Sequence, residues 1–77
     1  MPDGWALLAT DNQRPVVLEK DLGSFRLTVA RDLTRSNSWS FLIDCDGATV
    51  ATISADAIQD ENEAARAAEA WAREYVG

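Results

Sequence analysis

Hydrophobic and polar residues alternate along residues 24–31, where Phe25, Leu27 and Val29 fall on one side of an extended chain. Alternation with a period of two is typical of a half-buried β-strand. A shorter strand is predicted at 15–20, joined to the first through residues 21–23, whose glycine permits the positive φ of a tight connection. The pattern therefore predicts an antiparallel strand pair followed by a turn at 34–38.

Two further apolar runs, 39–45 and 48–54, are joined by Asp46-Gly47. This dipeptide is favoured in the two-residue type I′ turn of a β-hairpin, because both of its residues accept a positive φ. A two-residue loop predicts the register of the hairpin: Cys45 opposite Ala48, Ile43 opposite Val50 and Phe41 opposite Thr52.

That register distributes apolar side chains over both faces of the hairpin. One face receives Trp39, Phe41, Ile43 and Val50, and the other receives Leu42, Ala51 and Ile53. We expect one face to pack against a helix. The other is either covered by residues 5–9 or left open for a partner.

A helix is predicted to begin at Asp60, because Glu63 three residues later completes a capping box, and to stop at Gly77. Glu69 and Arg73 have the favoured i,i+4 orientation of an ion pair. Apolar residues at three- and four-residue spacing predict the buried stripe of this helix: Ala64, Ala67, Ala68, Trp71 and Tyr75.

The order of these elements predicts an α+β fold, an antiparallel β-meander of three to four strands followed by one C-terminal helix packed on a sheet face. Residues 5–9 are an additional strand or a short helical turn. The length of 77 residues suits a single domain spanning 1–77.

Composition removes several classes of chemistry. The chain has one cysteine and no histidine, which excludes an intrachain disulfide and the usual zinc ligand sets, so we expect neither metal nor cofactor. A nucleophilic Cys45 or serine lacks a histidine base, so we predict no catalytic residue and no enzyme. No apolar run is long enough for a membrane span or a signal sequence, so we expect a cytoplasmic protein.

The net charge of −6 is concentrated in one stretch of the chain. Residues 1–35 carry five acids and five bases, and residues 66–77 carry two of each, so both segments sum to zero. Such an acidic stretch repels nucleic-acid phosphates and favours a protein partner with a basic surface. The remaining acids are the predicted protein-binding residues: Asp44, Asp46, Asp56, Asp60, Glu61 and Glu63.

These acids form two groups on the predicted fold, roughly 25 Å apart at the rise of an extended strand. Asp44 and Asp46 lie at the hairpin tip, where Asp-Gly is also explained by turn geometry. The other four acids gather at the start of the helix and form the denser group, which we predict to be the main binding surface. Acids in a first helical turn also have a structural explanation, because the helix dipole stabilises them.

Trp5 is the remaining candidate binding residue. Trp39 and Trp71 fall on predicted core stripes, whereas Trp5 lies outside any periodic element. It is either an exposed anchor, since tryptophan is enriched at binding hot spots, or a side chain packed on the sheet.

An alternative function depends on Arg26, Arg31 and Arg35, which could form a basic stripe for nucleic acid along one strand and its following loop. Salt pairing with the acidic segment is the other explanation of these arginines. A third possibility is a small structural subunit that forms a homodimer.

The pattern of Trp39, Asp46-Gly47, Glu63-Ala64-Ala65 and Ala70-Trp71 resembles very small sheet-plus-helix proteins of bacteria and their phages. Among compact acidic phage proteins, the resemblance is to anti-CRISPR inhibitors. It implies a non-enzymatic inhibitor that binds the basic nucleic-acid groove of an effector complex and blocks access of the target.

Overall fold

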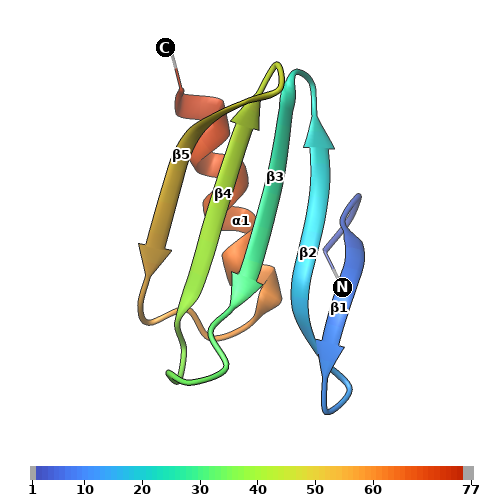
Figure 1. The fold of residues 1–77 in the computed structure, drawn as a ribbon, viewed down its shortest axis with the longest axis vertical. Coiled ribbons are helices and arrows are strands. Elements are labelled where there is room, and N and C mark those ends of the chain that lie inside the picture. Colours follow the sequence, from blue (N-terminus) through green and yellow to red (C-terminus); the bar gives the residue numbers. More distant parts are fainter. Residues whose placement is uncertain (1, 76–77) are drawn as a thin grey trace.

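One five-stranded antiparallel sheet with one helix across a face makes up the described residues, 2–75, of the computed structural model (Figure 1). Each strand lies beside its neighbour in sequence, which confirms the α+β meander. The predicted three to four strands become five because residues after Trp5 form an edge strand. In chain order the elements are β1 (Ala6–Asp11), β2 (Arg14–Leu22), β3 (Phe25–Arg31), β4 (Trp39–Cys45), β5 (Ala48–Ala55) and α1 (Glu61–Glu74).

The turn between β4 and β5 has the predicted geometry. Asp46 and Gly47 have φ values of 52° and 84°, the two positive values that a type I′ turn requires, and Cys45 pairs with Ala48 as expected. The same geometry joins β1 to β2, where Asn12 and Gln13 have φ values of 51° and 66°.

Beyond the turn, the predicted register of this hairpin is wrong. Ile43 pairs with Ala51 and not with Val50, because the register shifts by one residue between Ile43 and Asp44. Such a β-bulge adds one residue to one strand and exchanges the faces of the residues that follow. Phe41 consequently pairs with Ile53 in place of Thr52, so Ala51 and Ile53 contribute to the face covered by α1.

The core lies between α1 and the central strands. The largest fully buried side chains are Trp39, Leu18, Leu27, Ile43 and Val29. Against them α1 presents four buried alanines: Ala64, Ala65, Ala68 and Ala72. These small side chains allow the helix axis to lie close to the sheet.

Trp71 is only half-buried, which corrects its predicted place in the core. A bulky side chain at the centre of this close contact would push the helix away, and Trp71 lies at its flank, stacked on Tyr75 with ring centroids 5.3 Å apart. Phe25 meets the same tyrosine edge to face at 5.7 Å. The buried stripe therefore includes Ala65 and Ala72, and Trp71 belongs to an aromatic group beside it.

The sheet face opposite α1 is open, and it faces the viewer in Figure 1. Residues 5–9 do not cover it, since Trp5 lies on the helix side and β1 extends the sheet at its edge. The exposed side chains on β4 and β5 are Ser40, Leu42, Ala48, Thr49, Thr52 and Ser54. At 14 residues, α1 is too short to cross a membrane, and residues 2–75 contain no other helix.

Candidate functional site

The predicted binding acids at the helix start are largely occupied within the fold. Asp60 is the N-cap of α1, and its Oδ1 accepts a hydrogen bond from the Glu63 backbone N–H at 3.0 Å. Oε2 of Glu63 accepts from the Gln59 backbone N–H at 3.0 Å, one residue before the N-cap N–H that a capping box uses. The N-cap at Asp60 is confirmed, the reciprocal half of the capping box is displaced by one residue, and both carboxylates satisfy backbone donors at the start of α1.

Asp56 holds two loops together. Its Oδ1 accepts hydrogen bonds from the Ser38 hydroxyl at 2.7 Å and from Nη2 of Arg35 at 3.0 Å. These contacts join the loop after β5 to the β3–β4 loop, which the Asn37 carbonyl also holds by accepting from the Ile58 N–H. Of the four acids predicted here, only Glu61 has neither a side-chain hydrogen bond nor an ion pair within residues 2–75.

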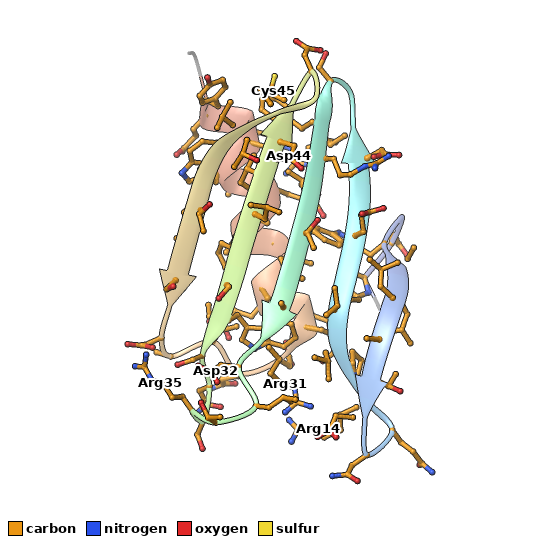
Figure 2. The ribbon with its side chains drawn as sticks, in the orientation of Figure 1. Arg14, Arg31, Asp32, Arg35, Asp44 and Cys45 are labelled. Atoms are coloured by element: carbon orange, nitrogen blue, oxygen red, sulfur yellow. The ribbon has the colours of Figure 1, made fainter. Side chains whose placement is uncertain are left out.

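The other predicted pair, Asp44 and Asp46, lies at the opposite end of the sheet, where Asp44 is on the open face. Thr49 donates its hydroxyl to Oδ1 of Asp44 at 2.7 Å, and Arg26 is the cross-strand neighbour of Asp44 on β3. Figure 2 shows Asp44 and Cys45 near one end of the molecule and Arg14, Arg31, Asp32 and Arg35 at the other.

Two acids of β2 join Asp44 around Arg26. Nε of Arg26 lies 3.1 Å from Oδ1 of Asp21 and 4.0 Å from Oε1 of Glu19. The hydrogen bond to Asp21, followed by the charges of Asp21 and Glu19, raises the pKa of Arg26. A hollow of about 570 Å³ beside these residues is lined by Asp21, Arg26 and Asp44.

We call this group the turn-end acidic cluster: Glu19, Asp21 and Asp44 on the open face, with Asp46 at the adjoining turn. One arginine, Arg26, lies beside these four acids. Counting charge along the sequence misses it, because Glu19 and Asp21 belong to a segment whose charges cancel. A partial signal was present in the predicted strand pair, because Glu19 lies near the end of the strand at 15–20 and Asp21 in its connection to the strand that carries Arg26.

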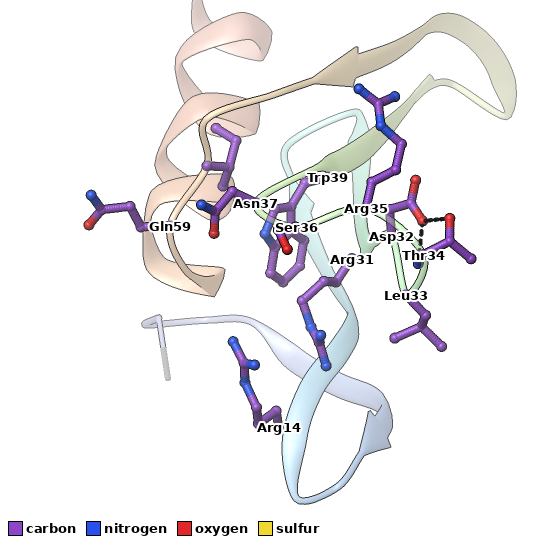
Figure 3. Close-up of a pocket in the computed structure, with 11 residues that line it drawn as sticks. Arg14, Arg31, Asp32, Leu33, Thr34, Arg35, Ser36, Asn37, Trp39 and Gln59 are labelled. Atoms are coloured by element: carbon purple, nitrogen blue, oxygen red, sulfur yellow. Dashed lines mark hydrogen bonds between the residues drawn. The ribbon is translucent and has the colours of Figure 1, made fainter.

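Arg26, Arg31 and Arg35 do not form the single basic stripe that the sequence suggested. Arg26 is bound to the turn-end acids on the open face, whereas Arg31 lies on the helix face at the far end of β3, beside Trp39. Arg31 and Arg35 instead join Arg14 around a cleft of about 200 Å³ (Figure 3). We call this the arginine cleft, and its other lining residues include Asp32, Ser36, Asn37, Trp39 and Gln59.

One donor in the arginine cleft is buried without a partner. Arg31 donates from Nε to the Pro15 carbonyl at 3.2 Å, and its Nη2 has no hydrogen-bond partner among residues 2–75. A buried unsatisfied donor costs roughly 1–3 kcal/mol. Such a donor is explained by strain, by a bound water or by a bound ion.

Asp32 lines the same cleft without neutralising Arg31. Its Oδ1 accepts from the backbone N–H and the hydroxyl of Thr34, at 2.8 and 2.7 Å. These two hydrogen bonds lower the pKa of Asp32. Figure 3 shows its carboxylate turned towards Thr34 and away from Arg31.

Trp5 is a core residue, only 4% exposed, so it is not the exposed binding anchor that the sequence allowed. Its indole Nε1 donates to Oε2 of Glu69 on α1 at 2.8 Å. The alternative of packing on the sheet is the correct one, because the Trp5 side chain belongs to the core cluster between the sheet and α1.

Cys45 is half-buried at the end of β4, and its Sγ lies 3.8 Å from Oδ2 of Asp46. Burial raises the pKa of this thiol, and the negative charge of Asp46 adds to the effect. Both effects reduce the thiolate fraction that a nucleophile needs. No group of three or more His, Cys, Asp or Glu residues within 2–75 is arranged to hold a metal ion.

Comparisons of this chain with protein-family models, with curated proteins and with solved structures found no match.

Proposed function

We propose that this chain is a non-enzymatic protein-binding domain that uses the open face of its sheet against a basic surface of another protein. The observation that carries the proposal is the combination, on one uncovered face, of exposed serine and threonine side chains on β4 and β5 and the turn-end acidic cluster. This assignment moves the main contact away from the helix start, where Asp60 and Glu63 already cap α1.

The open face has the composition of a surface that binds reversibly. Leu42, which is 38% exposed, lies among the serine and threonine side chains of β4 and β5 and supplies an apolar contact. The acids at one end would attract a basic partner and fix its orientation, since complementary charge raises association rates and selects among partners. Electrostatic attraction and a central apolar contact therefore act on the same face.

The partner surface that fits this charge is a nucleic-acid-binding groove rich in lysine and arginine. Occupying such a groove would inhibit the partner stoichiometrically, the mode of action that the resemblance to anti-CRISPR inhibitors implies. The raised pKa of Cys45 agrees with binding in place of covalent catalysis. A second copy of the chain is the competing occupant, and sedimentation would reveal it as a mass twice 8.4 kDa.

The test begins with affinity capture from a host lysate, mass spectrometry and measurement of the affinity for the captured partner. Asp44→Asn with Asp46→Asn removes two charges and keeps the hydrogen bond from Thr49 and the turn. We expect this variant to bind roughly tenfold more weakly at low salt. Asp3→Asn with Glu74→Gln removes the same charge from other exposed sites and should bind within about twofold of the parent.

A second pair of variants tests the face itself. Leu42→Lys places a cation at the proposed contact, whereas Leu8→Lys makes the same change on β1, where the leucine is 54% exposed. Binding should be lost in the first and retained in the second. The proposal would be contradicted if the two variants of each pair bound the partner with equal affinity. It would also be contradicted if the captured partner still bound its nucleic acid while bound to this protein.

A further inference from the structure

The arginine cleft gathers three cations from separate segments of an acidic chain. Arg14 is the first residue of β2, Arg31 the last of β3, and Arg35 lies in the β3–β4 loop. Figure 3 shows Arg14 extending from the β1–β2 hairpin towards the space beside Arg31. Arg35 extends away from the other two in Figure 3, so the pair that shares this space is Arg14 and Arg31, whose like charges repel one another unless an anion lies between them.

Arg31 is held ready to donate. The hydrogen bond from its Nε to the Pro15 carbonyl fixes the plane of the guanidinium, and its Nη2 is the buried donor with no partner among residues 2–75. A guanidinium offers its donors as a rigid fork that matches the oxygens of phosphate or carboxylate. An oxyanion is the ligand whose charge and paired oxygens match this fork.

The nearby acids leave two of the three arginines without an ion pair. Asp56 pairs with Arg35, and Asp32 is turned to Thr34. Neither Arg14 nor Arg31 has an ion pair within the described part of the chain. Arg14 and Arg31 are therefore free to contact an anion, and with Asp32 in the lining the cleft keeps a net positive charge of one.

We propose that the arginine cleft binds a small phosphate dianion, either inorganic phosphate or a phosphate monoester, independently of the protein binding proposed above. A tetrahedral phosphate can accept from two arginine forks approaching from different directions, whereas one fork satisfies the two oxygens of a carboxylate. Ser36, Asn37 and Gln59 line the cleft and carry further donors. Its volume of about 200 Å³ is below the roughly 300–1,000 Å³ of sites for drug-sized ligands, which favours a phosphate group with few attached atoms.

The test is an NMR titration of the full chain with inorganic phosphate, against chloride at equal ionic strength. We expect saturable shifts of the Arg31 Nε–H and of the Trp39 indole N–H with phosphate alone. Arg14→Gln should raise the dissociation constant about tenfold, the loss of one charge-assisted interaction. Arg66→Gln, the same change on an exposed face of α1, should leave it within about twofold.

Arg31→Lys tests the fork, because it keeps the charge and removes the planar donors. The backbone spectrum shows whether Arg31→Lys remains folded. If it is unfolded, Arg14→Gln still tests the site, because Arg14 is exposed and its substitution should not disturb the fold. Glycerol phosphate binding more tightly than inorganic phosphate would identify an organic ligand, and equal affinities would identify the free ion; both support a phosphate site.

Four results would overturn the proposal. The first is no saturable shift with phosphate, and the second is equal weakening by Arg14→Gln and Arg66→Gln. The third is acetate binding as tightly as phosphate, which would indicate a carboxylate site. The fourth is binding of a single-stranded oligonucleotide when both small phosphates fail, which would assign the arginines to nucleic acid.

Discussion

The indole N–H of Trp5 donates to the Glu69 carboxylate across 2.8 Å, joining the chain before β1 to the helix that ends the described fold. The same carboxylate receives Lys20 at 3.4 Å and Arg73 at 3.1 Å. The Arg73 contact is the i,i+4 pair that the sequence predicted. Glu69 is thus the polar centre that anchors the edge of the sheet to α1.

This contact predicts a loss of stability in acid. The hydrogen bond from Trp5 lowers the pKa of Glu69 below its ordinary value of 4.5, helped by Lys20 and Arg73 and opposed by burial. In the pH range just below 4.5 the unfolded chain therefore binds more protons than the folded protein, and the free energy of unfolding falls as the pH falls. Above that range the ionised Glu69 makes its full contribution to the free energy of unfolding.

Urea unfolding of the parent and of Glu69→Gln at several pH values isolates this effect, because the variant lacks the titrating group. The difference between their unfolding free energies should shrink as the pH falls below the ordinary value. Trp5→Phe keeps an aromatic side chain but removes the N–H donor and the five-membered ring from the core, so it should cost at least about 1.5–3 kcal/mol at neutral pH. A difference that does not change with pH would show that Glu69 titrates normally.

The helix cap predicts opposite results for two neighbouring acids. Asp60→Ala leaves the Glu63 N–H without its acceptor and should reduce the free energy of unfolding by about 1 kcal/mol. Glu61→Ala removes a first-turn acid with no side-chain hydrogen bond among the described residues and should cost less than about 0.5 kcal/mol. Urea unfolding followed by helical circular dichroism measures both, and Asp60→Ser should restore most of the loss.

The sequence predicted those features that depend on a few adjacent residues. The type I′ turn at Asp46-Gly47 and the cap at Asp60 are local, since each is decided by backbone preferences within four positions. The bulge beside Val50 is not, because it depends on how two strands fit together beneath the helix. One shifted residue was enough to exchange the faces of Ala51 and Ile53.

The candidate sites failed to emerge from the sequence for the same reason. Trp5 gave no periodic signal, and its burial depends on Glu69, which lies 64 residues away. The arginine cleft unites residues of β2, β3 and a loop, and Arg14 had no feature in the sequence to mark it. Tertiary neighbours also decide which acids are free, as the loss of Asp60 and Glu63 to capping shows.

Substitution of Ala57 by glycine should stabilise the fold. Its φ of 63° lies in the left-handed region, which costs a residue with a Cβ about 1–2 kcal/mol. Glycine relieves this strain, but it also makes the unfolded chain more flexible, which costs about 0.4–1 kcal/mol of stability. The net effect of Ala57→Gly should be an increase of about 0.5–1 kcal/mol in the free energy of unfolding measured with urea. Ala48→Gly, at an exposed position of β5, should lose a similar amount, and a loss at both positions would contradict the strain at Ala57.

The reactivity of Cys45 tests the electrostatics of the turn-end acidic cluster. Burial and the charge of Asp46 raise the pKa of this thiol above its ordinary value of 9.0, so the thiolate fraction at mildly alkaline pH is small. Asp46→Asn removes the negative charge and keeps a side chain that accepts the positive φ of the turn. The pKa should therefore fall, and the rate of reaction with an aromatic disulfide reagent should rise roughly twofold to fivefold. Asp44→Asn, which removes an equal charge one residue before Cys45, should leave the rate nearly unchanged. Equal acceleration by both variants would show that the overall field of the cluster, and not the Asp46 contact, controls the pKa of the thiol.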